Sequence, residues 1–525
     1  MQAFINGTFL SCEEEQSTFS VMVTNEGRIV YTGDTLPEAY ANAKKVDLQG
    51  AAVVPAFADT HMHFESYALF HSTVDVRDAA DFEDMGRMLK KYASEHPRDK
   101  VIAAYGCSAH VVKEKRLAAR QDLDQMTRRP LLIVKYDGHA AVANSALVAL
   151  LPKDVTDDPG FDRVTGWMYQ NAFYKGVNFI TSQIPIPRIL KGLVGAANEL
   201  TRQGIGLVHS VEGVGYQGDI DVDMLRMLRF GLPQAFRIFF QTMDVEKVKK
   251  RRMNRIGGCF KLALDGCFGS EDAALFAPYD NNPDNTGFLA YTQEEVNAFC
   301  RDANRARMQI AMHAIGDKAV EQALTALEAA LSDSPREDHR HIIIHADLIT
   351  NSQMERAAAM KVCVALQPAF LDWRQEPAEY LERILGRERA LAIEPLRSLT
   401  EHGILISAGS DAPCTLPNPL ESIHLCCNHP DPAQSVTVWD ALKMHTLWAA
   451  KMSFDEENRG SLTVGKFADF AVLAKDPLTM PIDRLRENSV LALYLAGQKV
   501  GELRGGMGGL ITRAAASYLS RKSFA

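Results

Sequence analysis

Eight short apolar runs along the middle of the chain constrain its fold more than any other feature. They alternate with stretches of helical pattern, such as Ala319–Leu331 and Gln353–Met360. This alternation is typical of a parallel α/β sheet or barrel, and eight strands are the number that closes a (β/α)8 barrel. We therefore predict an α/β protein built on a (β/α)8 TIM barrel. The eight runs are Ala52–Ala58, Gly206–Val211, Phe236–Gln241, Cys259–Leu264, Gln309–His313, His341–Ala346, Val362–Gln367 and Ile404–Ser410.

Two regions of the chain do not fit a minimal barrel. The gap between the first and second runs is much longer than a βα unit needs, and it contains the strand-like pieces Lys100–Tyr105 and Leu131–Tyr136. We interpret it as an inserted subdomain after the first strand. Both ends of the chain carry short strands with turns, which indicates a small β-sandwich domain formed from both termini. The predicted boundaries are 55–460 for the barrel, 70–200 for the insertion within it, 1–54 with 461–503 for the β-sandwich, and 504–525 for a C-terminal tail.

Charge and composition narrow the class of protein. The net charge is −9, which provides no basic field for nucleic acid or an acidic membrane. The sequence contains no run of about 18 apolar residues, which is the length needed to span a bilayer, and its first residues do not resemble a signal peptide. The nine cysteines form no C-x-x-C pair, which favours a reducing compartment. We expect a soluble cytoplasmic protein that acts on a small molecule, with no nucleic-acid or membrane partner; the sequence leaves open whether it forms a homo-oligomer.

Histidines and one acid stand at the ends of the predicted strands. His61 and His63 end the first run in an H-x-H pattern, and on a strand both point to the same face. His313, His345 and Asp411 end or follow three later runs. Because barrel enzymes assemble their sites at the carboxyl ends of several strands, one shared site explains this distribution better than separate loop caps. Imidazole and carboxylate groups are ligands for divalent transition metals.

Lys261 lies inside an apolar run, where an unpaired ammonium group is costly. Regular strand alternation would place it on the face that carries Cys259 and Ala263. The ammonium then needs an acidic partner, a lowered pKa or a covalent modification. A lysine that reacts with carbon dioxide becomes a carbamate, which is an anionic ligand able to bridge two metal ions.

The ordered set of H-x-H on the first strand, then Lys261, His313, His345 and Asp411, resembles the amidohydrolase superfamily. The flanking residues are similar to its long-chain members, the group that includes N-substituted formamide deformylase. One difference is that Ile344 stands before His345, where such relatives usually have Glu. The similarity extends over nearly the whole chain, through the segments Pro55–His63, Lys135–His139, Lys261–Gly266, His313–Asp317, Gly409–Pro413 and Gly460–Asp469.

This resemblance implies a metal-dependent hydrolase that acts on a non-peptide amide or related C–N bond. One or two divalent ions are expected per chain, with zinc favoured by the ligand types. A metal-bridged hydroxide would attack the substrate, and Asp411 would act as general acid and base. The implied ligands are His61, His63 and Asp411 for one ion and His313 with His345 for the other, with carboxylated Lys261 bridging the two.

A second group of residues is predicted to contact the substrate. They lie in the insertion, at the end of the second strand run, or just after the seventh run. The alternative for the residues in the insertion is that they only form hydrogen bonds within their own loop. The alternative for His209 is a core histidine with a hydrogen-bond partner. The group comprises Lys135, Asp137, His139, His209, Gln367, Asp372 and Trp373.

Two other functions stay open. One is a mononuclear metal-dependent deaminase of a heterocycle; that class generally places Glu shortly after the histidine of the fifth strand, whereas the segment after His313 reads Ala-Ile-Gly-Asp. The other is a catalytically silent barrel with a binding or regulatory role, although barrels that lose catalysis tend to lose metal ligands. Elemental analysis, a hydrolysis screen and an assay for ammonia release separate the three.

Overall fold

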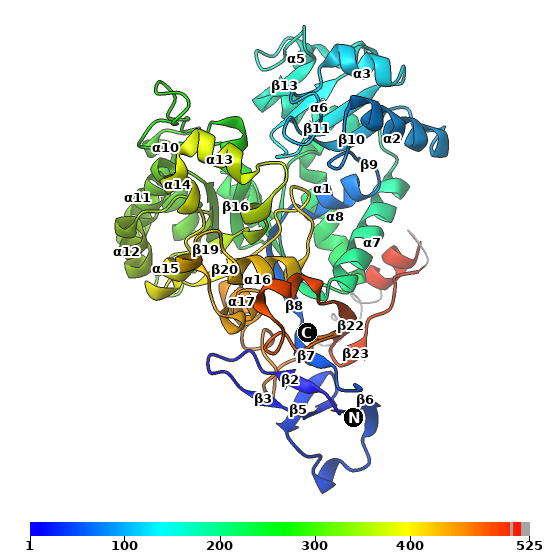
Figure 1. Cartoon of the computed structure of the whole chain (residues 1–525), viewed down its shortest axis with the longest axis vertical. Coiled ribbons are helices and arrows are strands. Elements are labelled where there is room, and N and C mark those ends of the chain that lie inside the picture. Colours follow the sequence, from blue (N-terminus) through cyan, green and yellow to red (C-terminus); the bar gives the residue numbers. More distant parts are fainter. Residues whose placement is uncertain (505–507, 516–525) are drawn as a thin grey trace.

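Eight parallel strands form the central sheet of the computed structural model, which describes residues 1–504 and 508–515. Their order around the sheet follows the chain from β8 to β20. The first and last strands lie side by side, because the hydroxyl of Ser407 donates to that of Thr60 at 2.9 Å and the Asp411 N–H donates to the His61 carbonyl at 2.7 Å. The predicted (β/α)8 barrel is confirmed as a nearly closed barrel (Figure 1). Its strands are β8 (Phe57–Met62), β14 (Ile205–Glu212), β15 (Ala235–Phe240), β16 (Arg255–Ala263), β17 (Gln309–Ala314), β18 (Ile342–His345), β19 (Cys363–Leu366) and β20 (Ile406–Ala408).

Helices cover the outside of the barrel, so its strands are buried on both faces. Strand β18 reads Ile-Ile-Ile-His and is buried throughout, which is typical of a parallel strand packed between helices. The two helices predicted from the sequence are confirmed as α11 and α12. At the start of α12 the Thr350 hydroxyl accepts from the Gln353 N–H, and the Gln353 side chain accepts from the Thr350 N–H. The helices around the barrel include α7 (Ile186–Arg202), α8 (Ile220–Leu228), α9 (Val245–Lys250), α10 (Gln293–Arg305), α11 (Asp317–Asp333), α12 (Asn351–Met360), α13 (Ala378–Leu385), α14 (Arg387–Leu391), α15 (Leu396–Glu401), α16 (Pro419–Cys427), α17 (Val438–Met444) and α18 (Leu447–Met452).

The first predicted strand, Ala52–Ala58, is wrong as a single element. The structure divides it into β7 (Ala52–Pro55) and β8, which belong to different sheets. The backbone changes partner at this point: the Ala56 N–H donates to the Asp469 carbonyl, whereas the next N–H donates to the Gly204 carbonyl, each at 2.9 Å. An apolar run shows neither the change of partner nor the change of sheet.

Strands from both ends of the chain meet in one sheet. In the six-stranded sheet β23-β22-β21-β7-β2-β3, β7 pairs antiparallel with β21, with Val54 opposite Ala471. A four-stranded sheet, β5-β4-β1-β6, packs on it, and the rings of Phe4 and Phe470 are nearly perpendicular, with centroids 5.0 Å apart. The boundaries of this sandwich stay a prediction, and residues 505–507 and 516–525 of the predicted tail lie outside the described residues. The strands are β1 (Gln2–Ile5), β2 (Thr8–Leu10), β3 (Thr18–Phe19), β4 (Val21–Asn25), β5 (Arg28–Gly33), β6 (Lys44–Asp47), β21 (Phe470–Leu473), β22 (Val490–Leu495) and β23 (Gln498–Lys499).

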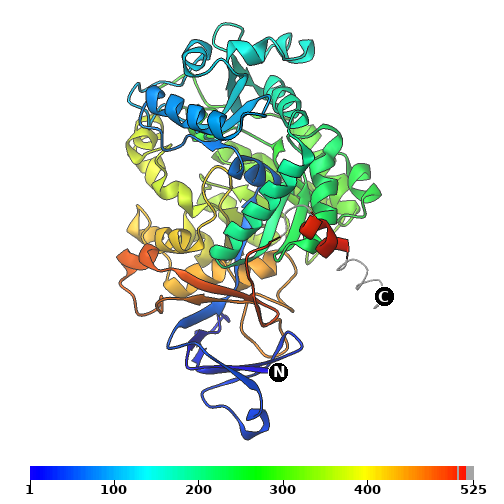
Figure 2. The same cartoon turned by 90° about the vertical axis from the view of Figure 1, so that its right-hand side faces the viewer.

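The segment between β8 and β14 forms a separate five-stranded sheet of order β13-β12-β11-β10-β9. Figures 1 and 2 show this sheet and its helices at the opposite end of the molecule from the terminal sheets. It contacts the end of the barrel beyond β20, where Arg77 donates to the carbonyl of Pro413 at 3.0 Å. The insertion therefore covers the barrel end at which the predicted ligands lie. Its elements include α1 (Phe64–His71), β9 (Val74–Asp75), α2 (Phe82–Glu95), β10 (Ile102–Cys107), α3 (Arg120–Met126), β11 (Leu131–Lys135), β12 (Ala140–Ala143), α4 (Ser145–Val148), α5 (Lys153–Thr156), β13 (Trp167–Tyr169) and α6 (Gln170–Ser182).

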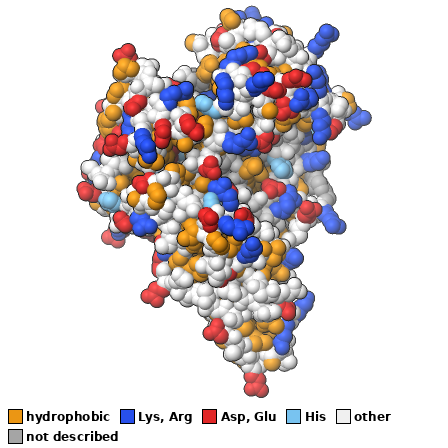
Figure 3. Space-filling view, in the orientation of Figure 1, with side chains coloured by type: hydrophobic (Ala, Val, Ile, Leu, Met, Phe, Trp, Pro, Cys, Tyr) orange, Lys and Arg blue, Asp and Glu red, His pale blue; other side chains and the backbone are white. Residues whose placement is uncertain are grey.

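The surface carries mixed charge. On the face shown in Figure 3, acidic and basic side chains are interspersed over the barrel and the insertion. Within the part of the chain that the structure describes, no helix combines the length and apolar character needed to cross a bilayer.

Candidate metal centre

The strand ends bring the four predicted histidines and Asp411 together in one buried group. One carboxylate oxygen of Asp411 lies 3.2 Å from Nε2 of His61 and 3.4 Å from Nε2 of His63. The ring of His345 lies 5.6 Å from that of His61 and 4.7 Å from that of His313, measured between centroids. All five side chains are buried, although they come from four different strands or strand ends. Of the predicted ligands, only Lys261 lies elsewhere.

The backbone at this site is held in unusual conformations. His345 and Asp411 have φ angles of 73° and 53°, in the left-handed region that residues other than glycine seldom adopt. Gly409 lies so close to β8 that a Cβ atom there would be 2.4 Å from the backbone nitrogen of His61. Strain of this kind costs about 1–3 kcal/mol per residue and concentrates at functional sites, where the surrounding structure maintains it.

Asp265 fixes the orientation of His313. Its carboxylate accepts hydrogen bonds from the N–H groups of Ile315 and Gly316, at 3.0 and 2.8 Å, and lies 3.4 Å from Nε2 of His313. Nε2 also lies 3.0 Å from the carbonyl of Gly266. The other ring nitrogen, Nδ1, is buried without a hydrogen-bond partner. A histidine held at one nitrogen by a carboxylate, with the other nitrogen free, is the usual arrangement of a metal ligand.

The protonation states suit metal binding. Burial lowers the pKa values of His61 and His345, so their rings are neutral at pH 7. Burial also lowers the pKa of His313, but Asp265 outweighs this effect and raises it above its ordinary value, which makes the ring a more basic ligand. Burial raises the pKa of Asp411, yet the facing His61 and His63 outweigh burial and hold it well below its usual value. The neutral rings of His61 and His345, beside the ionised carboxylate of Asp411, are suitable donors for a divalent transition metal.

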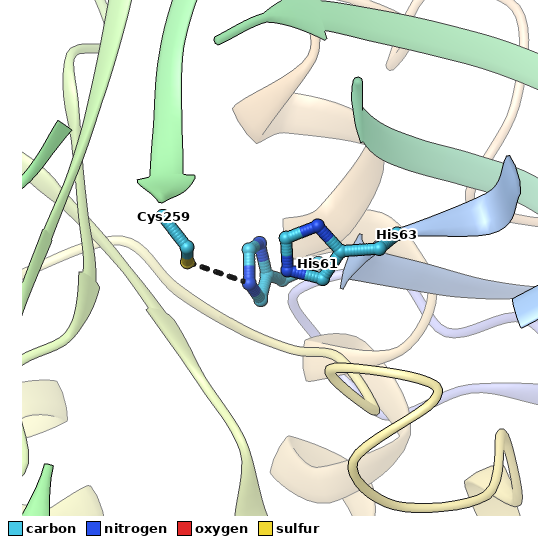
Figure 4. A group of neighbouring side chains, drawn as sticks. All are labelled: His61, His63 and Cys259. Carbon is cyan, nitrogen blue, oxygen red and sulfur yellow. Dashed lines mark hydrogen bonds between the residues drawn. The ribbon is translucent and has the colours of Figure 1, made fainter. Parts of the chain in front are cut away.

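Lys261 does not join this group. Its ammonium donates to the carbonyl of Gly213 at 2.6 Å and lies 3.5 Å from Asp219, with 45% of the side chain exposed. The expectation that Lys261 shares a strand face with Cys259 is therefore wrong. Cys259 is buried inside the barrel, and Figure 4 shows its sulfur directed toward His61, with His63 beside them.

The physical reason is a large irregularity in β16. Gly258 pairs with Met312 and Ala263 pairs with His313, so residues 259–262 have no opposite partner in β17. Gly257, with a φ of 105°, passes so close to β17 that a Cβ atom there would be 1.9 Å from the Ala311 carbonyl. The two-residue alternation of a regular strand does not continue through such a segment.

A narrow cavity of about 40 Å³ opens beside the histidines. Among the predicted substrate contacts, Asp137, His139 and Trp373 line it. The Trp373 ring stacks on Phe370 with centroids 4.7 Å apart, which forms a flat apolar wall. The structure thus brings part of the insertion, and part of the loop after β19, to the candidate metal centre.

The other predicted contacts do not line this cavity. Lys135 is paired with Asp137 at 2.6 Å, Gln367 is buried and donates to the carbonyl of Ala365, and His209 is enclosed in the barrel interior. Asp372 lies on the surface, 3.3 Å from Arg486, so the prediction that it forms a wall of the pocket is wrong.

Sequence reasoning missed several residues of the site. Asp347 and Glu376 line the cavity, and Asp265 lies behind His313. Asp265 could have been found from the sequence, because it directly follows the apolar strand segment that ends at Leu264. Cys259 also lies in a predicted strand, but sequence reasoning assigns it no role at the site.

Buried histidines and a carboxylate at the carboxyl ends of barrel strands are typical of metal-dependent barrel hydrolases. The chain belongs to the Amidohydro_3 amidohydrolase family, whose model matches residues 44–500. The protein is thus a hydrolase which, at the level of the family, acts on C–N bonds other than peptide bonds.

Individual relatives cover almost the full length of the chain. It is 26% identical to the "Putative amidohydrolase YtcJ" of Bacillus subtilis (strain 168), over 96% of this chain and 100% of that protein. It is 24% identical to the N-substituted formamide deformylase of Arthrobacter pascens, over 94% of this chain and 97% of that one. The crystal structure of an uncharacterized metal-dependent hydrolase from Pyrococcus furiosus superposes with a TM-score of 0.73 and 26% identity, over 91% and 100% of the two chains. The resemblance seen in the sequence is confirmed.

Proposed function

We propose that the protein is a zinc-dependent hydrolase that cleaves a non-peptide amide or related C–N bond of a small molecule, with Asp411 as general acid and base. The observation that carries this proposal is the position of Asp411. One of its oxygens lies within 3.4 Å of two histidines, has no hydrogen-bond donor among the described residues, and borders the cavity.

The donor set fits a divalent ion. His61, His63 and Asp411 would hold one ion, and His313 with His345 would hold a second. The unpartnered Nδ1 of His313 is the kind of buried polar atom that a metal satisfies. When bound, such an ion lowers the pKa of water and polarises a carbonyl group. A carbamate of Lys261 is not part of this proposal, because that amine bonds to Gly213.

Asp411 would move the proton that hydrolysis requires. Its lowered pKa keeps the carboxylate ionised at pH 7, ready to take a proton from the attacking water. The same group can then deliver that proton to the leaving nitrogen. Its backbone is fixed by the hydrogen bond to the His61 carbonyl, so the carboxylate keeps its position between the two steps.

The cavity favours a small substrate with an apolar substituent. Its volume of about 40 Å³ has room for only a small group around the scissile bond. The stacked rings of Phe370 and Trp373 would receive a flat or branched apolar group, while the polar residues opposite would orient the scissile bond. A relative named N-substituted formamide deformylase supports an amide that carries a substituent on nitrogen.

A substrate screen tests the proposal. Metal-free protein and zinc-loaded protein are compared on libraries of formamides, acylated amines, carbamates and lactones. Amine release is the readout for the first three libraries, and acid release is the readout for the lactones. We expect hydrolysis of a C–N bond by the zinc-loaded protein, and its loss in Asp411→Asn. Equal turnover by the metal-free protein, or ammonia release from a heterocycle with no amide hydrolysis, would contradict the proposal.

We also propose a cytoplasmic location. All nine cysteines are free thiols, as expected in a reducing compartment. Cell fractionation tests this location, and recovery of the protein outside the cytoplasm would contradict it.

A further inference from the structure

Cys259 occupies the position between the two pairs of histidines. Its sulfur lies 3.1 Å from Nε2 of His61 and 3.7 Å from Nε2 of His345. It belongs both to the group that contains His61 and His63 and to the group that contains His313 and His345, and in each group the ligand atoms lie within 4.8 Å of one another. We infer that the Cys259 thiolate, in place of a carbamate on Lys261, is the ligand shared by both metal ions. This inference rests on the metal-dependent function proposed above.

The separations agree with shared coordination. A tetrahedral ion with a sulfur bond of about 2.3 Å and a nitrogen bond of about 2.0–2.1 Å places the two ligand atoms about 3.5 Å apart. The two measured sulfur–nitrogen distances, 3.1 and 3.7 Å, lie on either side of that value. Nδ1 of His313 is buried without a partner on the same side of the barrel, which adds an independent indication of a missing ligand.

The local backbone holds the sulfur in place. The Cys259 N–H donates to Oε1 of Gln241 at 3.1 Å, and the Gln241 amide donates in turn to the Val211 carbonyl at 3.2 Å. Cys259 is therefore anchored to the neighbouring strands at the point where β16 loses its pairing with β17. Rigid support of this kind is what a metal ligand requires.

Lys261 is fixed in a different direction. Its amine bonds to Gly213 and faces Asp219, and its carbonyl accepts a hydrogen bond from the Tyr291 hydroxyl at 2.9 Å. Moving the amine to the histidines would break these contacts. Because segment 259–262 is irregular, the thiol of Cys259 faces the barrel interior, where the amine of Lys261 is expected from the sequence.

A shared thiolate has a chemical consequence. On binding, the S–H bond breaks, the proton leaves to solvent and a sulfur electron pair forms the bond to the metal. Because thiolate is a soft ligand, it favours zinc, cobalt or cadmium over manganese and magnesium. Replacement of Cys259 should therefore weaken zinc binding more than manganese binding.

The test is cobalt(II) titration of the metal-free full-length chain, followed through the thiolate-to-cobalt charge-transfer band and by elemental analysis. The variants are Cys259→Ser, Lys261→Met and, as a matched control in the barrel interior, Cys363→Ser. We expect the band in the wild type, Lys261→Met and Cys363→Ser. In Cys259→Ser the band should vanish, and cobalt affinity should fall about tenfold or more.

X-ray absorption of the zinc-loaded wild type needs no variant and covers the case in which Cys259→Ser fails to fold. We expect one sulfur at about 2.3 Å from zinc. A zinc shell of nitrogen and oxygen only, or loss of metal in Lys261→Met but not in Cys259→Ser, would overturn the inference and leave the hydrolase proposal intact. Failure of the wild type to bind zinc or cobalt would overturn both.

Discussion

Replacing Asp265 with Asn should loosen His313 and weaken metal binding. Oδ1 of Asp265 accepts from the Ile315 N–H and faces Nε2 of His313, while Oδ2 accepts from the N–H groups of Ala274 and Gly316 at 2.9 and 2.8 Å. Asn has one acceptor oxygen and one amino group. However the amide is turned, its amino group faces two N–H donors.

The size of the effect follows from these contacts. A hydrogen bond to a charged group contributes about 1.5–3 kcal/mol, and Asp265→Asn removes at least one such bond and weakens the others. We expect the free energy of unfolding to fall by about 2–4 kcal/mol. Loss of the carboxylate that orients a ligand imidazole costs about 10- to 100-fold in metal affinity. The expected loss in metal-binding free energy is therefore about 1.4–2.7 kcal/mol.

Two assays measure the two effects separately. Chemical unfolding of the metal-free protein gives the loss of stability, and zinc titration against a competing chelator gives the loss of affinity. Asp272→Asn is a matched control, because this partly buried carboxylate lies on the same loop and accepts from the Cys267 N–H at 2.7 Å. If Asp265→Asn binds zinc as tightly as the wild type, Asp265 supports only the loop, and the reasoning about His313 is refuted.

Three further perturbations have defined outcomes. Asp411→Asn should lower kcat/KM by about 100- to 10,000-fold on any amide that the screen identifies, with secondary structure unchanged by circular dichroism; a fall of less than tenfold would exclude it as general acid and base. Burial raises the pKa of Asp455, but Arg237 outweighs burial and holds this pKa below its ordinary value. The ion pair therefore stabilises the fold at pH values above the unfolded-state pKa of about 4. This contribution is lost as the pH falls through the lower folded-state pKa. Asp455→Asn should therefore cost about 2 kcal/mol at pH 7 and almost nothing at the lowest pH at which urea unfolding can be followed, whereas an equal cost at both would contradict the pairing. Phe470→Ala should cost about 3–5 kcal/mol in the same assay, because the ring is fully buried against Phe4 and Tyr494; a cost below 1 kcal/mol would show that the terminal sheets contribute little to stability.

The sequence predicts the barrel and most of the metal centre for a simple physical reason. Parallel strands buried on both faces read as apolar runs, and their carboxyl ends meet at one end of a barrel. His61, His63, His313, His345 and Asp411 could be grouped from their positions in the runs alone. The split of the first run was not visible, because the apolar character continues through the change of sheet at Ala56.

The identity of the fourth-strand ligand could not be predicted from alternation. That rule assumes a continuous ladder, whereas residues 259–262 have no partners in β17. Which side chain faces inward then depends on Gly257 and Gly258, whose φ angles of 105° and 150° redirect the chain. The prediction that Asp372 forms a wall of the cavity is wrong because the turn after β19 directs Trp373 to the cavity and Asp372 to the surface.

Anomalous diffraction from crystals of the zinc-loaded protein tests the central claim most directly. Data on both sides of the zinc absorption edge locate the ions without reference to activity. The account predicts one or two peaks among His61, His63, His313, His345 and Asp411, within about 2.0–2.3 Å of the ligand atoms. Zinc peaks only at other positions, or none in a protein that is fully active, would contradict it.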